Sequence, residues 1–155
     1  MDLMDTILGQ TLNKYRTLKT EYLWRKVFND HTFREWTLDL IRQDQLFDKG
    51  IDGDGIIIGL YSEVTEMINP SKEAGTPYTL FDTGEFYKSF ILYVYNNYIE
   101  IDADPIKIDK NGDQDNLFKK YGENIIKLSQ SNLEKFIIEF KWRFQRELRQ
   151  LLQLY

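Results

Sequence analysis

The sequence has no cysteine and only one histidine, His31, among its 155 residues. The absence of cysteine excludes a disulfide scaffold, a thiolate metal site and a cysteine nucleophile. A single histidine excludes a His–His metal site within one chain and leaves little material for a Ser-His-Asp triad, so His31 is most simply a turn residue between helices. The composition therefore argues against most classes of enzyme.

The sequence also has no excess of positive charge and no long apolar run. Its 20 basic and 25 acidic residues give a net charge of −5, so no global field favours nucleic acid. The apolar run at residues 90–95 is far shorter than the roughly 18 residues of a membrane span. Asp2 and Asp5 stand where a secretory signal would be basic and then apolar. We therefore expect a protein made in the cytoplasm, without a membrane partner.

Aromatic side chains, by contrast, are abundant. Ten Tyr, ten Phe and three Trp residues must be placed in a core or in an interface. Charge is unevenly distributed, because residues 47–130 hold fifteen acidic and eight basic side chains whereas residues 131–155 hold three acidic and five basic ones. This distribution suits head-to-tail contact between copies, although such a run is more often a solvated acidic face.

Helical periodicity is found at both ends of the chain. Apolar residues recur every three or four positions from Met4 to Tyr22, which predicts a helix over residues 5–28. Capping-box spacing at Thr32 and Glu35 predicts a second helix over residues 33–46, and the same spacing at Ser131 opens a long terminal helix. The predicted core stripe of the terminal helix is Leu133, Ile137, Phe140, Phe144, Leu148 and Leu151.

The middle of the chain is typical of short strands and turns. The β-branched run 56–61 after a glycine-rich stretch predicts a strand, and residues 62–68 predict a short helix. Residues 90–95 and 98–103 predict a hairpin around an Asn96-Asn97 turn in the left-handed conformation. Residues 109–116 are expected to be a polar loop. The predicted fold is one α+β domain over residues 1–155, an antiparallel sheet with a central hairpin, packed by N-terminal helices and a long C-terminal helix.

One face of the terminal helix has the composition of a binding site. Trp142 lies about 180° from the predicted core stripe, with Ile138, Arg146 and Arg149 around it. Trp24 lies opposite the apolar stripe of the first helix and is a second interface candidate. A second layer of the same chain would cover the Trp142 face equally well. A stripe of Arg143, Arg146 and Arg149 facing nucleic acid is the remaining, weaker alternative.

Carboxylates are the only candidates for catalysis or metal binding. Oxygen ligands at alternate positions of residues 109–115 resemble a calcium loop, but Gln114 and Lys120 replace the required Gly and Glu. Glu63 and Glu66 lie three residues apart, and the spacing of Asp82 and Glu85 is explained by helix capping. We therefore expect no catalytic residue, no metal and no cofactor, with a carboxylate-dependent metal hydrolase as an alternative.

Gly75 is followed by a loop and by a motif of Asp82, Thr83, Gly84, Glu85 and Ser89, within a segment that ends at Phe90. This segment resembles one in the small neck and tail-completion proteins of tailed bacteriophages. Residues 45–47 and 50–52, together with Tyr61, Ser62 and Thr65, resemble the version found in phages of Bacteroides-type hosts. With Lys120-Tyr121-Gly122, which resembles an aromatic-Gly step before the last helix of that family, the likeness spans roughly residues 43–130.

This resemblance implies a structural virion protein, a head-tail connector without enzymatic activity or cofactor. It implies a homo-oligomeric ring, six- or twelvefold, whose partners are the portal, other neck proteins or the tail, with non-specific contact to packaged DNA. The acidic middle of the chain argues against a direct grip on DNA. A small intracellular, phage-encoded binding or inhibitor module is the other non-enzymatic alternative.

Overall fold

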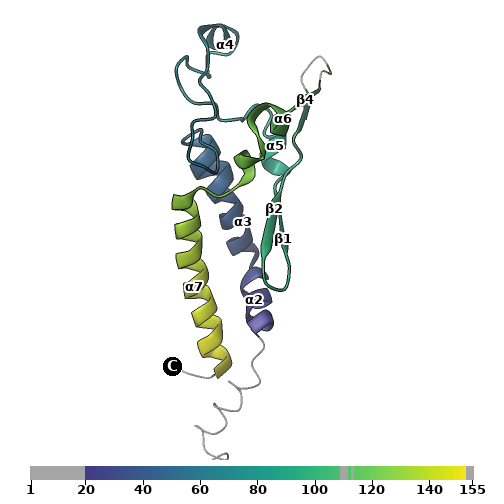
Figure 1. Ribbon diagram of the computed structural model, residues 1–155, viewed down its shortest axis with the longest axis vertical. Helices are drawn as coiled ribbons and strands as arrows, with labels where there is room; N and C mark the ends of the chain where they lie inside the picture. Colours follow the sequence, from purple (N-terminus) through teal and green to yellow (C-terminus); the bar gives the residue numbers. More distant parts are fainter. Residues whose placement is uncertain (1–19, 109–111, 113, 153–155) are drawn as a thin grey trace, which may run out of the picture.

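The structure is a computed structural model that describes residues 20–108, 112 and 114–152. A column of helices forms its long axis (Figure 1). In this column α2 (Thr20–Phe28) is followed by α3 (His31–Asp39) and by η2 (Leu40–Phe47), a π-helix that continues α3. The last helix, α7 (Gln130–Leu152), runs back alongside them. Between η2 and α7 the chain forms α4 (Glu63–Ile68), α5 (Glu85–Lys88), β1 (Ile91–Val94), β2 (Ile99–Asp102), β3 (Ile106–Ile108), β4 (Gln114–Asn116), α6 (Leu117–Tyr121) and η3 (Glu123–Ile126). The fold class is α+β, as predicted.

An aromatic cluster joins the three long helices. Phe28 is fully buried, and its ring centroid lies 5.4 Å from that of Phe33 in α3 and 5.7 Å from that of Phe140 in α7. Phe136 stacks on both Phe28 and Phe33, at 6.4 and 5.9 Å. Burial of each such ring stabilises the fold by roughly 1.5–3 kcal/mol. Much of the aromatic surplus therefore belongs to the core.

The turn between α2 and α3 is capped differently from the prediction. Asp30 is the N-cap, and its carboxylate accepts hydrogen bonds from the amides of Thr32, at 2.9 Å, and Phe33, at 3.4 Å. The helix therefore begins at His31, two residues earlier than the Thr32 box predicted. Aspartate is one of the strongest N-capping residues, which explains the change. Most of the first helix predicted at 5–28 lies outside the described residues.

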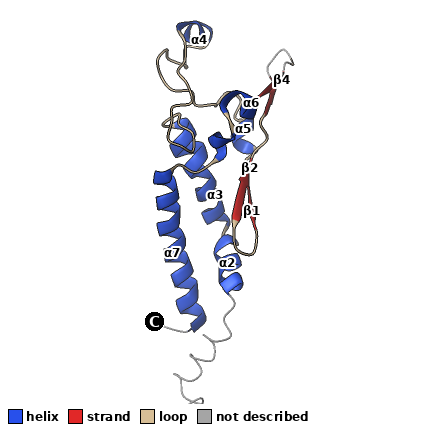
Figure 2. Cartoon of the chain, viewed as in Figure 1, coloured by secondary structure: helices blue, strands red, loops and turns tan. Residues whose placement is uncertain are grey.

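The sheet is two separate hairpins. β1 and β2 pair antiparallel, with Leu92 opposite Ile101 and Val94 opposite Ile99, as the alternation of residues 99–103 predicts. The left-handed conformation predicted for Asn96 and Asn97 is wrong. Among the described non-glycine residues, only Leu80 has a positive φ. The second pair is β3 and β4, and β4 (labelled in Figure 2) lies within residues 109–116, where a polar loop was expected, although residues 109–111 and 113 are outside the described part.

The strand predicted over residues 56–61 is wrong. Within the described chain this segment makes only two isolated bridges, Ile51 to Ile57 and Leu60 to Pro77. Ile56, Ile57 and Leu60 are exposed and only Ile58 packs against the core, so the β-branched run has no neighbouring strand and little cover. The short helix after it is confirmed as α4, capped by Ser62.

A buried polar network holds the start of α7 against η2. The side-chain amide of Gln45 donates to the Lys127 carbonyl and accepts from the Ser129 amide, both at 2.8 Å. Asn132, also fully buried, donates to the Leu40 carbonyl at 2.6 Å. α7 begins at Gln130 rather than at Ser131, because these contacts order the chain before the predicted cap.

We predict that Gln45→Leu lowers the free energy of unfolding by about 2 kcal/mol, because it leaves a buried amide and a buried carbonyl without partners. The matched control is Gln43→Leu, whose side chain is exposed and bonds only to Asp48. We expect that control to change stability by less than about 0.5 kcal/mol. Equal effects in urea denaturation would show that the buried network does not hold α7.

Candidate protein interface

The outer face of α7 has apolar side chains that the rest of the described chain does not cover. Ile138 is 70% exposed and Trp142 is 54% exposed, one turn apart. Phe136, Phe140 and Phe144 on the inner side pack against the core. Because a helix turns 100° per residue, inward packing of these three rings directs Ile138 and Trp142 outward. The predicted outward orientation of Trp142 and Ile138 is therefore observed.

Basic side chains border this apolar face. The guanidinium of Arg146 lies over the Trp142 ring, 5.0 Å from its centroid. A shallow hollow of about 210 Å³ is lined by Trp142, Arg146 and Arg149 with two glutamines, Gln145 and Gln150. Exposed Trp and Arg side chains held in place by each other are the composition of a binding hot spot. We call Ile138, Lys141, Trp142, Arg146 and Arg149 the outer face of α7.

Arg143 does not belong to this face. Its guanidinium forms ion pairs with Asp30 and Glu139 and lies over the Phe33 ring, 4.8 Å from the centroid. Burial alone would raise the pKa of the Asp30 carboxyl, but Arg143 and the amides of Phe33 and Thr32 hold it below its ordinary value. The structure therefore divides the predicted stripe of three arginines, and the alternative of a continuous basic stripe for nucleic acid is wrong.

Trp24 is a second correction. Its ring centroid lies 4.8 Å from that of Phe28 and 5.2 Å from that of Phe140, and its indole NH donates to the Tyr95 carbonyl at 2.7 Å. The residue therefore joins α2, α7 and the β1–β2 hairpin and faces the core instead of the outside. Tyr22, the described residue of the predicted apolar stripe, is 53% exposed, so the opposite side of α2 is the one that packs inward.

The residues of the resemblance motif form a junction between α5 and the hairpins. The Ser89 hydroxyl donates to the Phe86 carbonyl at 2.7 Å and accepts from the Asp104 amide at 3.0 Å. Gly84 is the N-cap of α5 with a φ of +79°, and Asp82 forms an ion pair with Lys107 at 2.8 Å. The predicted capping by Asp82 and Glu85 is wrong, although the helical turn exists. The other motif residues are Gly75, with a φ of +81°, Thr83, whose hydroxyl accepts from the Glu85 amide at 3.4 Å, and Glu85.

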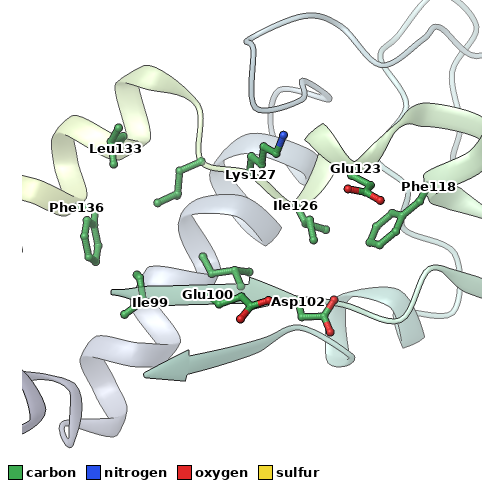
Figure 3. A pocket seen from close by; sticks show the side chains of 11 residues that line it. Ile99, Glu100, Asp102, Phe118, Glu123, Ile126, Lys127, Leu133 and Phe136 are labelled. Atoms are coloured by element: carbon green, nitrogen blue, oxygen red, sulfur yellow. The ribbon is translucent and has the colours of Figure 1, made fainter. Parts of the chain in front are cut away.

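A groove that the sequence did not predict lies between β2 and the start of α7. It has a volume of about 530 Å³, and Figure 3 shows side chains of β2 on one side and those of α6, η3 and α7 on the other. Ile99, Ile101, Phe118, Ile126, Leu128, Leu133 and Phe136 make most of it apolar. β2 pairs only with β1 in the described chain, so its other edge borders the groove. The exposed Leu133 was assigned to the core, and the groove explains its exposure.

The carboxylates give little support for metal chemistry. No group of three or more His, Cys, Asp or Glu side chains able to hold a metal ion is found among the described residues. Glu66 accepts a hydrogen bond from the Ala74 amide at 3.1 Å, which orders the loop after α4. Within the described chain, no helix is both long and apolar enough to cross a membrane.

No family model matches the chain, and no curated protein or solved structure is significantly similar to it. The likeness to phage neck proteins therefore rests on the sequence of residues 43–130 alone.

We predict that Arg143→Ala lowers the free energy of unfolding by roughly 1–2 kcal/mol, through loss of the half-buried ion pairs and the cation–π contact. Arg146→Ala, its matched control on the outer face, should change stability by less than about 0.5 kcal/mol. The effect of Arg143→Ala should shrink below about pH 4, because the lowered pKa of Asp30 stabilises the fold only while its carboxyl is ionised. Identical urea curves for both variants at pH 7 would contradict this assignment.

Proposed function

We propose that the chain is a non-enzymatic structural protein of a tailed bacteriophage particle, a connector that forms a ring at the head–tail junction. In this role it joins the portal to the tail and helps to retain DNA. The observation that carries the proposal is the exposed face formed by Ile138, Trp142, Arg146 and Arg149 on a helix held by a rigid aromatic core. Such a face suits burial against another subunit.

The sequence supplies the second support. The motif from Gly75 to Ser89 resembles that of neck and tail-completion proteins, and its contacts at α5 are structural. A ring protein needs two different surfaces that complement each other and no nucleophile, which suits a chain without cysteine and with one histidine. The net charge of −5 favours contacts with proteins over a direct grip on DNA.

The groove beside β2 favours a second candidate, a small binding or inhibitor module made by a phage. Its apolar lining and the free edge of β2 suit an extended peptide that adds a strand, while Glu100, Asp102 and Glu123 on the rim favour a basic partner. In this case the chain acts in the host cell and is not a part of the particle.

Particle composition separates the two candidates. We expect the chain in purified tailed particles in a fixed ratio to the portal protein, by quantitative mass spectrometry. We expect Trp142→Ala to leave the stability of the isolated chain within about 0.5 kcal/mol and to reduce tail attachment. Tyr98→Ala, which removes a side chain with a similar exposed fraction of 51%, is the matched control.

Absence of the chain from purified particles, together with its recovery on a host protein, would favour the binding module. Normal tail attachment in the Trp142→Ala variant would remove the outer face of α7 from the proposal. Equal loss in the Trp142→Ala and Tyr98→Ala variants would show that the effect is not specific to that face.

A further inference from the structure

The short helix α4 has the most exposed large apolar side chains of the described chain. Met67 is 83% exposed and Ile68 is 80% exposed, and Val64 lies on the same side of the helix, three and four residues earlier. α4 lies at one end of the molecule, beyond the helical column (Figure 1), and α7 extends away from it. A monomer rarely exposes apolar side chains grouped in this way unless they bind something.

The arm that presents α4 is ordered by its own contacts. At its base the Tyr61 amide donates to the Thr76 carbonyl and the Gly75 amide donates to the Tyr61 carbonyl, both at 2.9 Å. Tyr78 packs so closely on Gly59 that a Cβ there would lie 2.4 Å from the tyrosine ring. The Ser62 hydroxyl caps the helix by accepting from the Thr65 amide at 3.2 Å. α4 is therefore presented in a defined orientation.

The charges of α4 are complementary to those of the outer face of α7. α4 contains Glu63 and Glu66 and no basic residue, and Glu73 follows in the adjoining loop. Within the described chain neither Glu63 nor Glu73 forms a salt bridge. The outer face of α7 supplies Lys141, Arg146 and Arg149, of which only Arg146 is in an ion pair within the described residues, with Glu147 at 3.6 Å.

We propose that α4 of one copy packs across the Ile138–Trp142 face of α7 in the next copy. Val64, Met67 and Ile68 cover Trp142 and Ile138, while Glu63 and Glu73 approach the basic side chains that border them. Both apolar stripes follow the spacing of a helix face, so the two helices pack side by side. This inference rests on the proposed function, because it names the contact by which the ring is built.

The two surfaces lie on different elements of one molecule, so in the proposed ring each copy offers α4 to one neighbour and the outer face of α7 to the other. Such a heterologous contact closes into a ring when the rotation per subunit permits it, and otherwise continues as a filament. In a closed ring every subunit is held from two sides, so each single contact can be modest.

Cysteine cross-linking tests this contact without background, because the natural chain has no cysteine. The double variant Met67→Cys with Ile138→Cys places one thiol on each surface, and both positions are exposed. Mild oxidation of particles that contain this variant should give a ladder of disulfide-linked chains beyond the dimer, which reduction returns to the monomer. In the matched control Met67→Cys with Asn97→Cys, where Asn97 lies in the exposed hairpin turn, no ladder should form.

Zero-length carbodiimide cross-linking of natural particles is the second measurement, and it needs no substitution. It should join Lys141 of one copy to Glu63 or Glu73 of another. A covalent band that stops at the dimer would overturn the proposal, because it indicates a symmetric contact. Particles that contain the chain but yield neither cross-link would overturn the α4–α7 contact and leave the proposed function standing. Absence of the natural chain from particles would overturn both.

Discussion

Phe28 lies where α2, α3 and α7 meet, and the orientation of the outer face depends on its contacts. Its ring packs against Phe33, Phe136 and Phe140, which fixes the rotation of α7 about its own axis. With these rings inside, helical geometry leaves Ile138 and Trp142 outside. A rotation of α7 by one residue, about 100°, would turn both away from this outward direction. The packing of the core therefore determines which side chains are free to bind another molecule.

Local patterns predicted the elements that local chemistry determines. The β1–β2 hairpin follows from strict alternation, and the start of α4 follows from the capping chemistry of Ser62. The strand pattern failed at residues 56–61, because tertiary contacts supply only two isolated bridges there. The capping pattern failed at α3, because a stronger local cap, Asp30, precedes Thr32. The candidate site was predicted in part. Helical spacing alone places Trp142 outward. The cover over Trp24 and Arg143 comes from neighbouring elements, which spacing within one helix does not reveal.

The aromatic and arginine residues consequently have two separate roles. Trp24, Phe28 and Arg143 are held by several elements at once and stabilise the fold. Arg146 lies over Trp142, which is 54% exposed, so the described chain gains little stability from them. The fold does not require these side chains, yet they are grouped on a helix that the core holds in place. An interface best explains this arrangement. In the proposed ring, the acidic and apolar α4 of the next copy supplies the opposite charge to that interface.

The reactivity of Trp142 in the assembled particle tests the central claim most directly. Hydroxyl-radical footprinting with mass spectrometry compares oxidation of each tryptophan in the isolated chain and in purified particles, with partly buried Trp24 and Trp36 as internal references. If the outer face of α7 is covered by another subunit, Trp142 should be oxidised readily in the isolated chain and several-fold more slowly in the particle, while the two references stay unchanged. Equal oxidation of Trp142 in both states would contradict the account.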